Sequence, residues 1–230
     1  MKIDFGKILG RENFKMDNNI PTSYIVRKGF AVVSSIFWGQ IKSIGIKKKG
    51  KRPQISRTAK IIQKNNIVLG NNVRIGEKVE IDALSVNGII LGDNVKIGNK
   101  SSIFCTGSLE KIGKGLKIGS NSFFSESTFF GAAGGIKIGE NVISGQNVRF
   151  HSENHLFDDL NKLIKEQGTS SEGIIIGNNC WIGAGVVFLD GSQINDGCVV
   201  AANAVVSGVF PKNSVIGGVP AKLIRKRGNF

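Results

Sequence analysis

The two histidines of the chain, His151 and His155, lie four residues apart and offer the clearest potential for acid–base chemistry. An imidazole titrates near pH ~6.5, so a histidine can remove a proton from an alcohol at neutral pH. Such a base needs a carboxylate on its second ring nitrogen. Asp158, Asp159 and Glu166 are all within reach by sequence, and the sequence does not choose among them.

A six-residue phrase repeats along most of the chain and must supply the framework for these residues. The phrase LGNNVR (69–74) is followed by IGEKVE (75–80), and related phrases begin at 91, 97, 118, 138, 176 and 182. Of the 18 lead positions from Leu69 to Val206, 17 are apolar, and 16 of the 18 fifth positions are small. Each hexad is therefore predicted to be a short strand whose lead residue points inward and whose fifth residue fills a corner. Glycine at the second position, present in 10 of 18 hexads, is expected to permit a tight backbone there.

Grouping the hexads in threes predicts about six coils, which begin at 69, 91, 118, 138, 176 and 194. Every coil is then 18 residues plus an insertion after its third hexad, so all insertions leave from one corner. Only the insertion after coil four is long. The expected fold is an all-β solenoid, a parallel β-helix over residues 67–210 with a loop excursion at 156–175. Residues 1–66 form a basic, partly helical N-terminal extension, and residues 211–230 form a closing segment with a basic tail.

These repeats resemble the hexapeptide-repeat acyltransferase family, whose fold is a left-handed parallel β-helix, and the resemblance covers about residues 66–227. The left hand is implied by the family alone. Carbonic anhydrases of related fold use three histidines, whereas this chain has two, so no metal is expected. Cys180 and Cys198 are fifth-position residues one coil apart, and with no C-x-x-C in the chain we expect two buried free thiols.

The long excursion sharpens the resemblance to the sugar O-acetyltransferase branch of the family, which places a catalytic histidine at this point. The matching residue is His155, which would remove the proton of the acceptor hydroxyl, with Asp158 or Glu166 as the preferred orienting carboxylates. His151 is expected in the wall of the site and is the second choice as base. Asn154 is expected to contact the acceptor. Trp181, at an outward position, would flank the acceptor or acyl site, with packing against another subunit as the alternative.

The resemblance also implies acetyl-CoA as the donor, bound along the C-terminal coils. The backbone N–H of Ala184 is the candidate for stabilising the oxyanion. The other positions that match donor contacts are Gly183, Ala202, Ser207, Lys222 and Arg225, of which the last two match cations near the nucleotide phosphates. Family members are trimers with sites between columns, so a homotrimer is expected.

The net charge of +14 is concentrated at one end of the chain. Residues 1–68 hold 15 Lys/Arg against 3 Asp/Glu, whereas residues 69–230 hold 16 against 14. A nearly neutral body does not favour nucleic acid as the partner. Apolar residues at helical spacing from Val26 to Ile44 stand beside lysines and arginines, which predicts a helix that either packs on the column or contacts a membrane surface. With no signal peptide or spanning segment recognised, the chain is expected in the cytoplasm, with the inner face of a membrane as the alternative.

The expected function is an acetyl-CoA-dependent O-acetyltransferase that modifies a sugar hydroxyl in a surface polysaccharide or its precursor. Leu156 stands where maltose- and galactoside-type enzymes often have proline, which favours a glycan over a free disaccharide. The alternatives are an N-acetyltransferase of an amino sugar or nucleotide sugar, and a non-catalytic β-helix scaffold. The sequence does not name the sugar, the hydroxyl or the acyl length.

Overall fold

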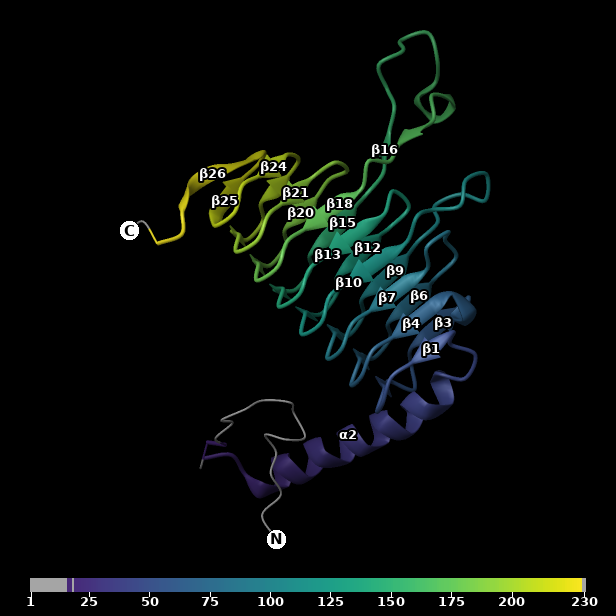
Figure 1. The fold of residues 1–230 in the computed structure, drawn as a ribbon, viewed down its shortest axis with the longest axis vertical. Coiled ribbons are helices and arrows are strands. Elements are labelled where there is room, and N and C mark those ends of the chain that lie inside the picture. Colours follow the sequence, from purple (N-terminus) through teal and green to yellow (C-terminus); the bar gives the residue numbers. More distant parts are fainter. Residues whose placement is uncertain (1–15, 18, 229–230) are drawn as a thin grey trace.

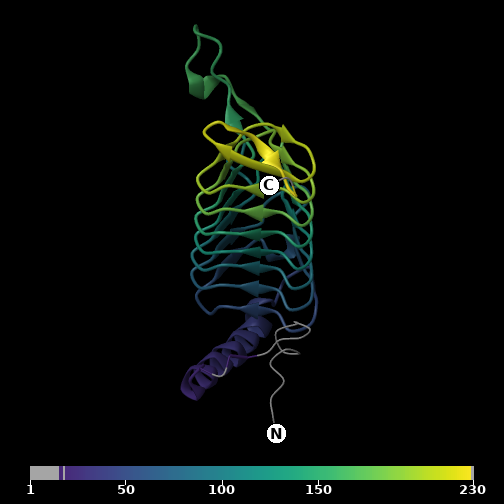
Figure 2. The same ribbon diagram turned by 90° about the vertical axis from the view of Figure 1, so that its left-hand side faces the viewer.

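The chain folds into a column of stacked coils, seen in a computed structural model that describes residues 16–17 and 19–228. Three sheets of mostly parallel strands wrap around one apolar core and form a parallel β-helix (Figures 1 and 2). Neighbouring strands within each sheet come from successive coils. A helix, α2 (Thr22–Lys42), adjoins the N-terminal end of the column.

Each coil contributes one short strand to each of the three sheets, here named A, B and C. Sheet A has the order β1 (Lys48–Lys49), β4 (Ile67–Leu69), β7 (Ile89–Leu91), β10 (Leu116–Ile118), β13 (Ile136–Ile138), β18 (Ile174–Ile176), β21 (Gln193–Ile194) and β24 (Val209–Phe210). Sheet B has the order β2 (Gln54–Ile55), β5 (Arg74–Ile75), β8 (Lys96–Ile97), β11 (Phe123–Phe124), β14 (Ile143–Ser144), β19 (Trp181–Ile182), β22 (Val199–Val200), β25 (Ser214–Gly218) and β26 (Ala221–Lys226). Sheet C has the order β23 (Val205–Val206), β20 (Val187–Phe188), β15 (Arg149–His151), β12 (Phe129–Gly131), β9 (Ser102–Phe104), β6 (Glu80–Asp82) and β3 (Lys60–Ile62). Two single-turn 3-10 helices, η1 (Lys64–Asn66) and η2 (Ile164–Glu166), and a small hairpin complete the fold.

The predicted inward and corner positions are confirmed by burial. Lead residues such as Leu69 and Ile182 are buried, and small fifth residues such as Val73 are buried beside them. Three lead phenylalanines, Phe130, Phe150 and Phe188, stack in successive coils with ring centroids 5.1 and 4.9 Å apart and planes within 4°. Because the strand register places each lead residue directly over the lead residue of the coil below, the buried side chains stack and form a continuous core.

The column is longer than the six coils predicted, because it begins at Lys48 rather than at residue 67. Strands β1, β2 and β3 pair in register with β4, β5 and β6, so the part that the structure describes contains seven complete coils. The excursion consequently follows the fifth coil. The hexad at 49–54 escapes detection because its lead position is Lys49 and its fifth position is Pro53, and neither matches the repeat.

The turns of the column depend on the fourth hexad position rather than on the second. Fourth-position residues such as Asn72 and Asn179 have φ of +55° and +54°, in the left-handed region that asparagine tolerates. Second-position glycines do not have positive φ. A Cβ at Gly70 would instead lie 2.6 Å from the backbone nitrogen of Asp93 in the next coil, so these glycines allow neighbouring coils to approach.

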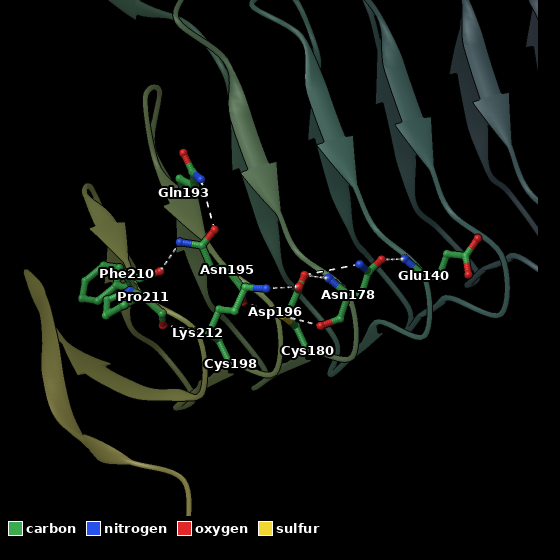
Figure 3. Close-up of polar contacts among 10 residues, drawn as sticks. All are labelled: Glu140, Asn178, Cys180, Gln193, Asn195, Asp196, Cys198, Phe210, Pro211 and Lys212. Carbon is green, nitrogen blue, oxygen red and sulfur yellow. Dashed lines mark hydrogen bonds and ion pairs between the residues drawn. The ribbon is translucent and has the colours of Figure 1, made fainter.

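Third-position side chains form a hydrogen-bonded ladder along the corner between sheets A and B. The backbone N–H of Glu140 donates to Asn178 Oδ1 over 2.8 Å, and the N–H of Asn178 donates to Asp196 Oδ1 over 2.8 Å (Figure 3). Lys212 closes this end of the ladder with a 3.1 Å ion pair to Asp196. The ladder supplies acceptors for backbone donors that the turns leave without a strand partner.

Two aspartates in this ladder make the stability of the column depend on pH. Donation from the backbone N–H of Asn71 lowers the pKa of Asp93, and donation from the N–H of Asn178 lowers that of Asp196. A carboxyl whose pKa is lower in the folded state stabilises the fold above its unfolded pKa of ~3.9, and that contribution disappears as pH falls through the folded pKa.

We therefore expect the melting temperature of the Asp93→Asn/Asp196→Asn variant to fall less steeply than that of the unmodified protein between about pH 4 and pH 2.5. The asparagine Oδ1 still accepts the N–H bond, but it does not titrate. Glu110→Gln, which removes an exposed carboxylate outside the ladder, should retain the original slope. If the melting temperatures of all three proteins fall equally steeply with pH over this range, the two aspartates do not cause the pH dependence.

The cysteines agree with the prediction of free thiols. Cys180 and Cys198 are buried and unpaired, as is Cys105. Their thiols donate to carbonyl oxygens, Cys180 Sγ to Asn195 O over 3.4 Å and Cys198 Sγ to Pro211 O over 3.3 Å (Figure 3). They act as small corner-filling residues whose one polar group is satisfied.

Candidate active site

The long insertion forms an arm that leaves the column between sheets C and A (Figure 1). It begins after β15, runs out as β16 (Asn154–His155), turns through η2 and returns as β17 (Thr169–Ser170). β16 and β17 pair antiparallel, and the N–H of Leu156 extends the pairing by donating to Gly168 O over 3.0 Å. The arm is therefore an ordered hairpin at its root, which gives its side chains fixed directions.

Asp190 anchors the returning strand of the arm to the column. Its carboxylate accepts hydrogen bonds from Gly173 N over 2.7 Å, from Glu172 N over 3.0 Å and from Ser170 Oγ over 3.3 Å. Sequence reasoning missed Asp190, because its partners precede it by 17 to 20 residues. The available signal was an aspartate followed by Gly191 at the corner from which the arm leaves.

His155 and Asn154 both lie on β16 and are exposed to solvent. His155 is directly opposite Thr169 across the hairpin, and Asn154 is opposite Ser170. Within residues 16–17 and 19–228, the imidazole of His155 has no hydrogen-bond partner. It is accessible to a substrate from the outside of the chain.

The carboxylate that lies on the same face as His155 is that of Glu153. Thr169 Oγ1 donates to Glu153 Oε2 over 3.2 Å, and Thr169 is the cross-strand partner of His155. Directly opposed residues of an antiparallel pair project from the same face, so Glu153 and His155 share it. Glu153 precedes His155 by two residues, the spacing at which residues of one strand share a face, but the pairing with Thr169 that defines this strand is made across the arm.

The carboxylates expected from the sequence lie further out on the arm. Asp159 accepts from Asn161 N over 3.0 Å and pairs with Lys162 at 3.5 Å, so it stabilises the tip. The side-chain carboxylates of Asp158 and Glu166 make no hydrogen bond or ion pair with any described residue. No contact among the described residues brings any of these three carboxylates to His155.

His151 lies on β15 at the outer surface of sheet C, half-buried against aromatic neighbours. Its ring is 5.2 Å from that of Phe129, which extends over Gly131, where a side chain would collide with it. Burial lowers the pKa of His151, and the positive charge of Arg149 lowers it further. His151 thus lies on the outer surface of the column, and its expected place in the wall of the site stays a prediction.

Gly183 and Ala184 form the turn between β19 and β20 in the sixth coil, and Ala202 occupies the same place in the seventh. At the opposite corner of sheet B, third-position side chains accept the N–H groups of neighbouring coils. Alanine offers no such acceptor, and the N–H of Ala184 has no partner in the part of the chain that the structure describes. This corner therefore presents a smooth surface with an open backbone donor.

Trp181 lies on β19 with 56% of its surface exposed. Phe123 and Ile143 precede it in the same outward row of sheet B, and both are also exposed. An exposed row of large apolar residues on a flat sheet is typical of a protein interaction surface.

The remaining expected donor-binding residues lie on two different parts of the C-terminal end. Ser207 follows β23, at the corner between sheets C and A. Lys222 and Arg225 lie on β26, which pairs antiparallel with β25 and closes sheet B. Lys222 is exposed opposite Gly217, and Arg225 donates to Lys226 O over 3.1 Å. The structure thus separates Ser207 from Ala184 and Ala202.

One chain does not bring His155 and Ala184 together. Ala184 precedes the sheet C strand of its coil, whereas the arm that carries His155 begins after the sheet C strand of the coil below. The corner that holds Ala184 and the corner from which the arm leaves lie at opposite ends of the sheet C strands. About five residues at ~3.3 Å each separate the two corners, so they are roughly 16 Å apart. Groups that must act on the same bond would have to come from two copies of the chain.

The described residues contain no group of three or more His, Cys, Asp or Glu side chains arranged to hold a metal ion. None of their helices is long and apolar enough to cross a membrane.

Two family models match the coils. Residues 173–208 match the bacterial transferase hexapeptide (six repeats), and residues 66–104 match the hexapeptide repeat of succinyl-transferase. Over these two segments the chain is similar to hexapeptide-repeat transferases. The matched segments lie on both sides of the arm, so the column that carries the arm is the part shared with this family.

Named acetyltransferases match parts of the chain. Galactoside O-acetyltransferase of Escherichia coli (strain K12) is 37% identical over 91 residues, which are 40% of this chain and 44% of that protein. The WbbJ protein of the same strain, whose name provisionally assigns it to O-acetyl transfer in lipopolysaccharide biosynthesis, is 50% identical over 56 residues, 24% of this chain and 29% of that protein. The chain spans less than half the length of each.

A solved structure with the same fold is AntD, an N-acyltransferase from Bacillus cereus in complex with dTDP and 3-hydroxybutyryl-CoA. The TM-score is 0.57 at 18% sequence identity, and the similarity covers 84% of this chain and 90% of that one. At this identity the similarity shows the fold alone.

Proposed function

We propose that the protein is an acetyl-CoA-dependent O-acetyltransferase that modifies a sugar hydroxyl, in a surface polysaccharide or its precursor, by direct transfer. The observation that carries the proposal is the exposed His155 on an ordered hairpin, with Glu153 on the same face, in a column of the transferase family. The matched O-acetyltransferases of Escherichia coli support transfer to oxygen. We take the column to have the left hand typical of the family.

In this mechanism His155 accepts the proton of the acceptor hydroxyl as its oxygen attacks the thioester carbonyl. A carbon–oxygen bond forms, the carbon–sulfur bond breaks, and His155 returns the proton to the leaving sulfur. Glu153, on the same face of the hairpin, would be the positioning residue that orients the imidazole once the acceptor is bound, in preference to Asp158 and Glu166. Asn154, exposed beside His155 on β16, would contact the acceptor sugar.

The donor fits the corner of Gly183, Ala184 and Ala202. Small side chains leave room for an extended pantetheine arm, and the open N–H of Ala184 can donate to the thioester oxygen as negative charge develops on it. Lys222 and Arg225 carry the charge that suits the nucleotide phosphates. Ser207, at another corner of the column, would reach a donor only if that donor is bound between two columns.

We further propose a homotrimer whose sites lie between columns, each using His155 of one copy and Ala184 of the next. The separation of these residues within one chain supports it, and the exposed row of Phe123, Ile143 and Trp181 provides an apolar surface for packing. Trp181 then serves the subunit interface. We place the activity in the cytoplasm, at the inner face of a membrane.

Complementation between two inactive variants tests the shared site. His155→Ala and Ala184→Pro chains, each nearly inactive alone, should regain activity when co-expressed, because some interfaces then combine an intact His155 with an intact Ala184. Random assembly of equal amounts leaves one intact site in four, so about a quarter of the original activity is expected. The measurement is acetyl transfer by the purified mixed trimers.

Two further outcomes decide the case. Activity that stays at the level of the single variants, in particles shown by light scattering to be mixed trimers, would place the site within one chain. A monomeric protein that is fully active would exclude the shared site altogether.

A further inference from the structure

Helix α2 makes its close contacts with the column through its C-terminal part, where the guanidinium of Arg57 also lies 5.3 Å from the ring of Trp38. Gly39 and Ser43 are buried there, and Lys42 Nζ donates to Ala59 O over 3.0 Å. A Cβ at Gly39 would lie 1.9 Å from Pro53 O, so glycine is required for this close approach. The rest of the helix extends away from the first coil (Figure 1).

The apolar stripe of α2 is not covered by the column. Its members recur every three or four residues on one face of the helix, and each has between 42% and 76% of its surface exposed: Val26, Phe30, Val33, Phe37 and Ile41. Packing of this stripe on the column, one of the two roles expected from the sequence, is therefore wrong. A stripe of this length, on a helix of 21 residues, calls for an external partner.

The positive charge around the apolar stripe favours an anionic surface as its partner. Between positions 18 and 76 the sequence has 12 Lys/Arg and no Asp or Glu. Arg27 and Lys28 belong to the helix itself, and Lys47, Lys48 and Lys49 follow its end. A second copy of this basic region would be repelled, whereas an anionic surface would be attracted. An exposed apolar face combined with basic residues is the pattern of helices that lie in the interface of anionic membranes.

We propose that α2 is a membrane-surface anchor, which buries its apolar stripe among the headgroups of an anionic bilayer. This deepens the proposed function by naming the surface that brings the enzyme to the membrane. Four coil spacings of ~4.8 Å separate β2, next to α2, from β14 in the coil that carries the arm, which is about 19 Å. A membrane-attached chain would hold its site within reach of a lipid-linked glycan of a few sugars.

Co-sedimentation of the full chain with vesicles tests this anchor without any substrate. The protein should bind phosphatidylserine–phosphatidylcholine vesicles, bind phosphatidylcholine vesicles much less, and be released as salt is raised. Phe30→Glu/Phe37→Glu should weaken partition by on the order of 100-fold, because two aromatic side chains no longer enter the interface. Both residues are exposed, so the column should keep its melting temperature.

A matched control and three outcomes make the test decisive. Val86→Glu/Val209→Glu changes the charge equally at exposed sites away from α2 and should bind like the unmodified chain. No binding to either vesicle, or unchanged binding of the Phe30→Glu/Phe37→Glu variant, would overturn the proposal. A concentration-dependent oligomer that this variant abolishes would make a second copy the occupant and also overturn it. Because partition is measured without substrate, its failure is distinct from failure of the acetyl-transfer assay.

Discussion

Replacement of His155 by alanine is expected to lower kcat by about 10²-fold to 10⁴-fold, the range for loss of a general base. The affinity for acetyl-CoA should remain nearly unchanged, because the donor corner at Ala184 and Ala202 is built from other residues. The measurement is steady-state acetyl transfer to a glycan acceptor, with donor binding followed separately by calorimetry. His151→Ala should cost much less, because His151 packs against Phe129.

The pH profile gives this experiment a second readout. The acidic limb of kcat/KM reports protonation of the free base, so it should disappear in His155→Ala. Glu153→Gln should shift that limb and lower kcat, whereas Asp158→Asn and Glu166→Gln should leave it in place if Glu153 holds the imidazole. A His155→Ala enzyme that keeps more than about a tenth of the original kcat would remove His155 from the mechanism and make His151 the candidate.

The coils could be predicted from the sequence because their burial pattern is local. Six residues determine each strand and corner, and the phrase at 69–74 repeats closely enough to fix the register. The first coil could not be predicted, because Lys49 stands where later coils have a buried apolar residue. There Lys49 Nζ instead donates to Ser43 Oγ over 2.9 Å and to Gln40 Oε1 over 3.3 Å. A contact with the preceding helix thus replaces the repeat.

The candidate site could be predicted only for residues whose side-chain type itself indicates acid–base chemistry. His155 stood out because the chain has two histidines. Glu153 did not, because its position depends on the pairing of Thr169 with His155, a contact made across the whole arm. Ala184 entered through the family resemblance alone, since an open backbone donor leaves no trace in its own side chain.

Ala184→Pro removes this backbone donor, and we expect it to lower kcat by about 10²-fold to 10³-fold, as loss of one oxyanion donor does. Ala184 and Gly185 are the central residues of the turn, and Gly185 has φ +70°. A positive φ only at the second central position is the pattern of a type II turn, which favours proline at the first. The substitution should therefore delete the N–H while the column keeps its shape.

Glu126→Pro is the matched control, since it makes the same change at the same corner two coils earlier. Ser127 beside it has φ +58°, and the N–H of Glu126, like that of Ala184, has no partner among the residues described. Glu126→Pro should retain its activity, and both variants should melt within a few degrees of the unmodified protein. If Ala184→Pro is properly folded and as active as Glu126→Pro, then the N–H of Ala184 does not stabilise the charge that develops during transfer. If only kcat falls and the affinity for acetyl-CoA stays constant, the donor acts in the transition state, because it binds the oxygen most strongly once that oxygen carries negative charge.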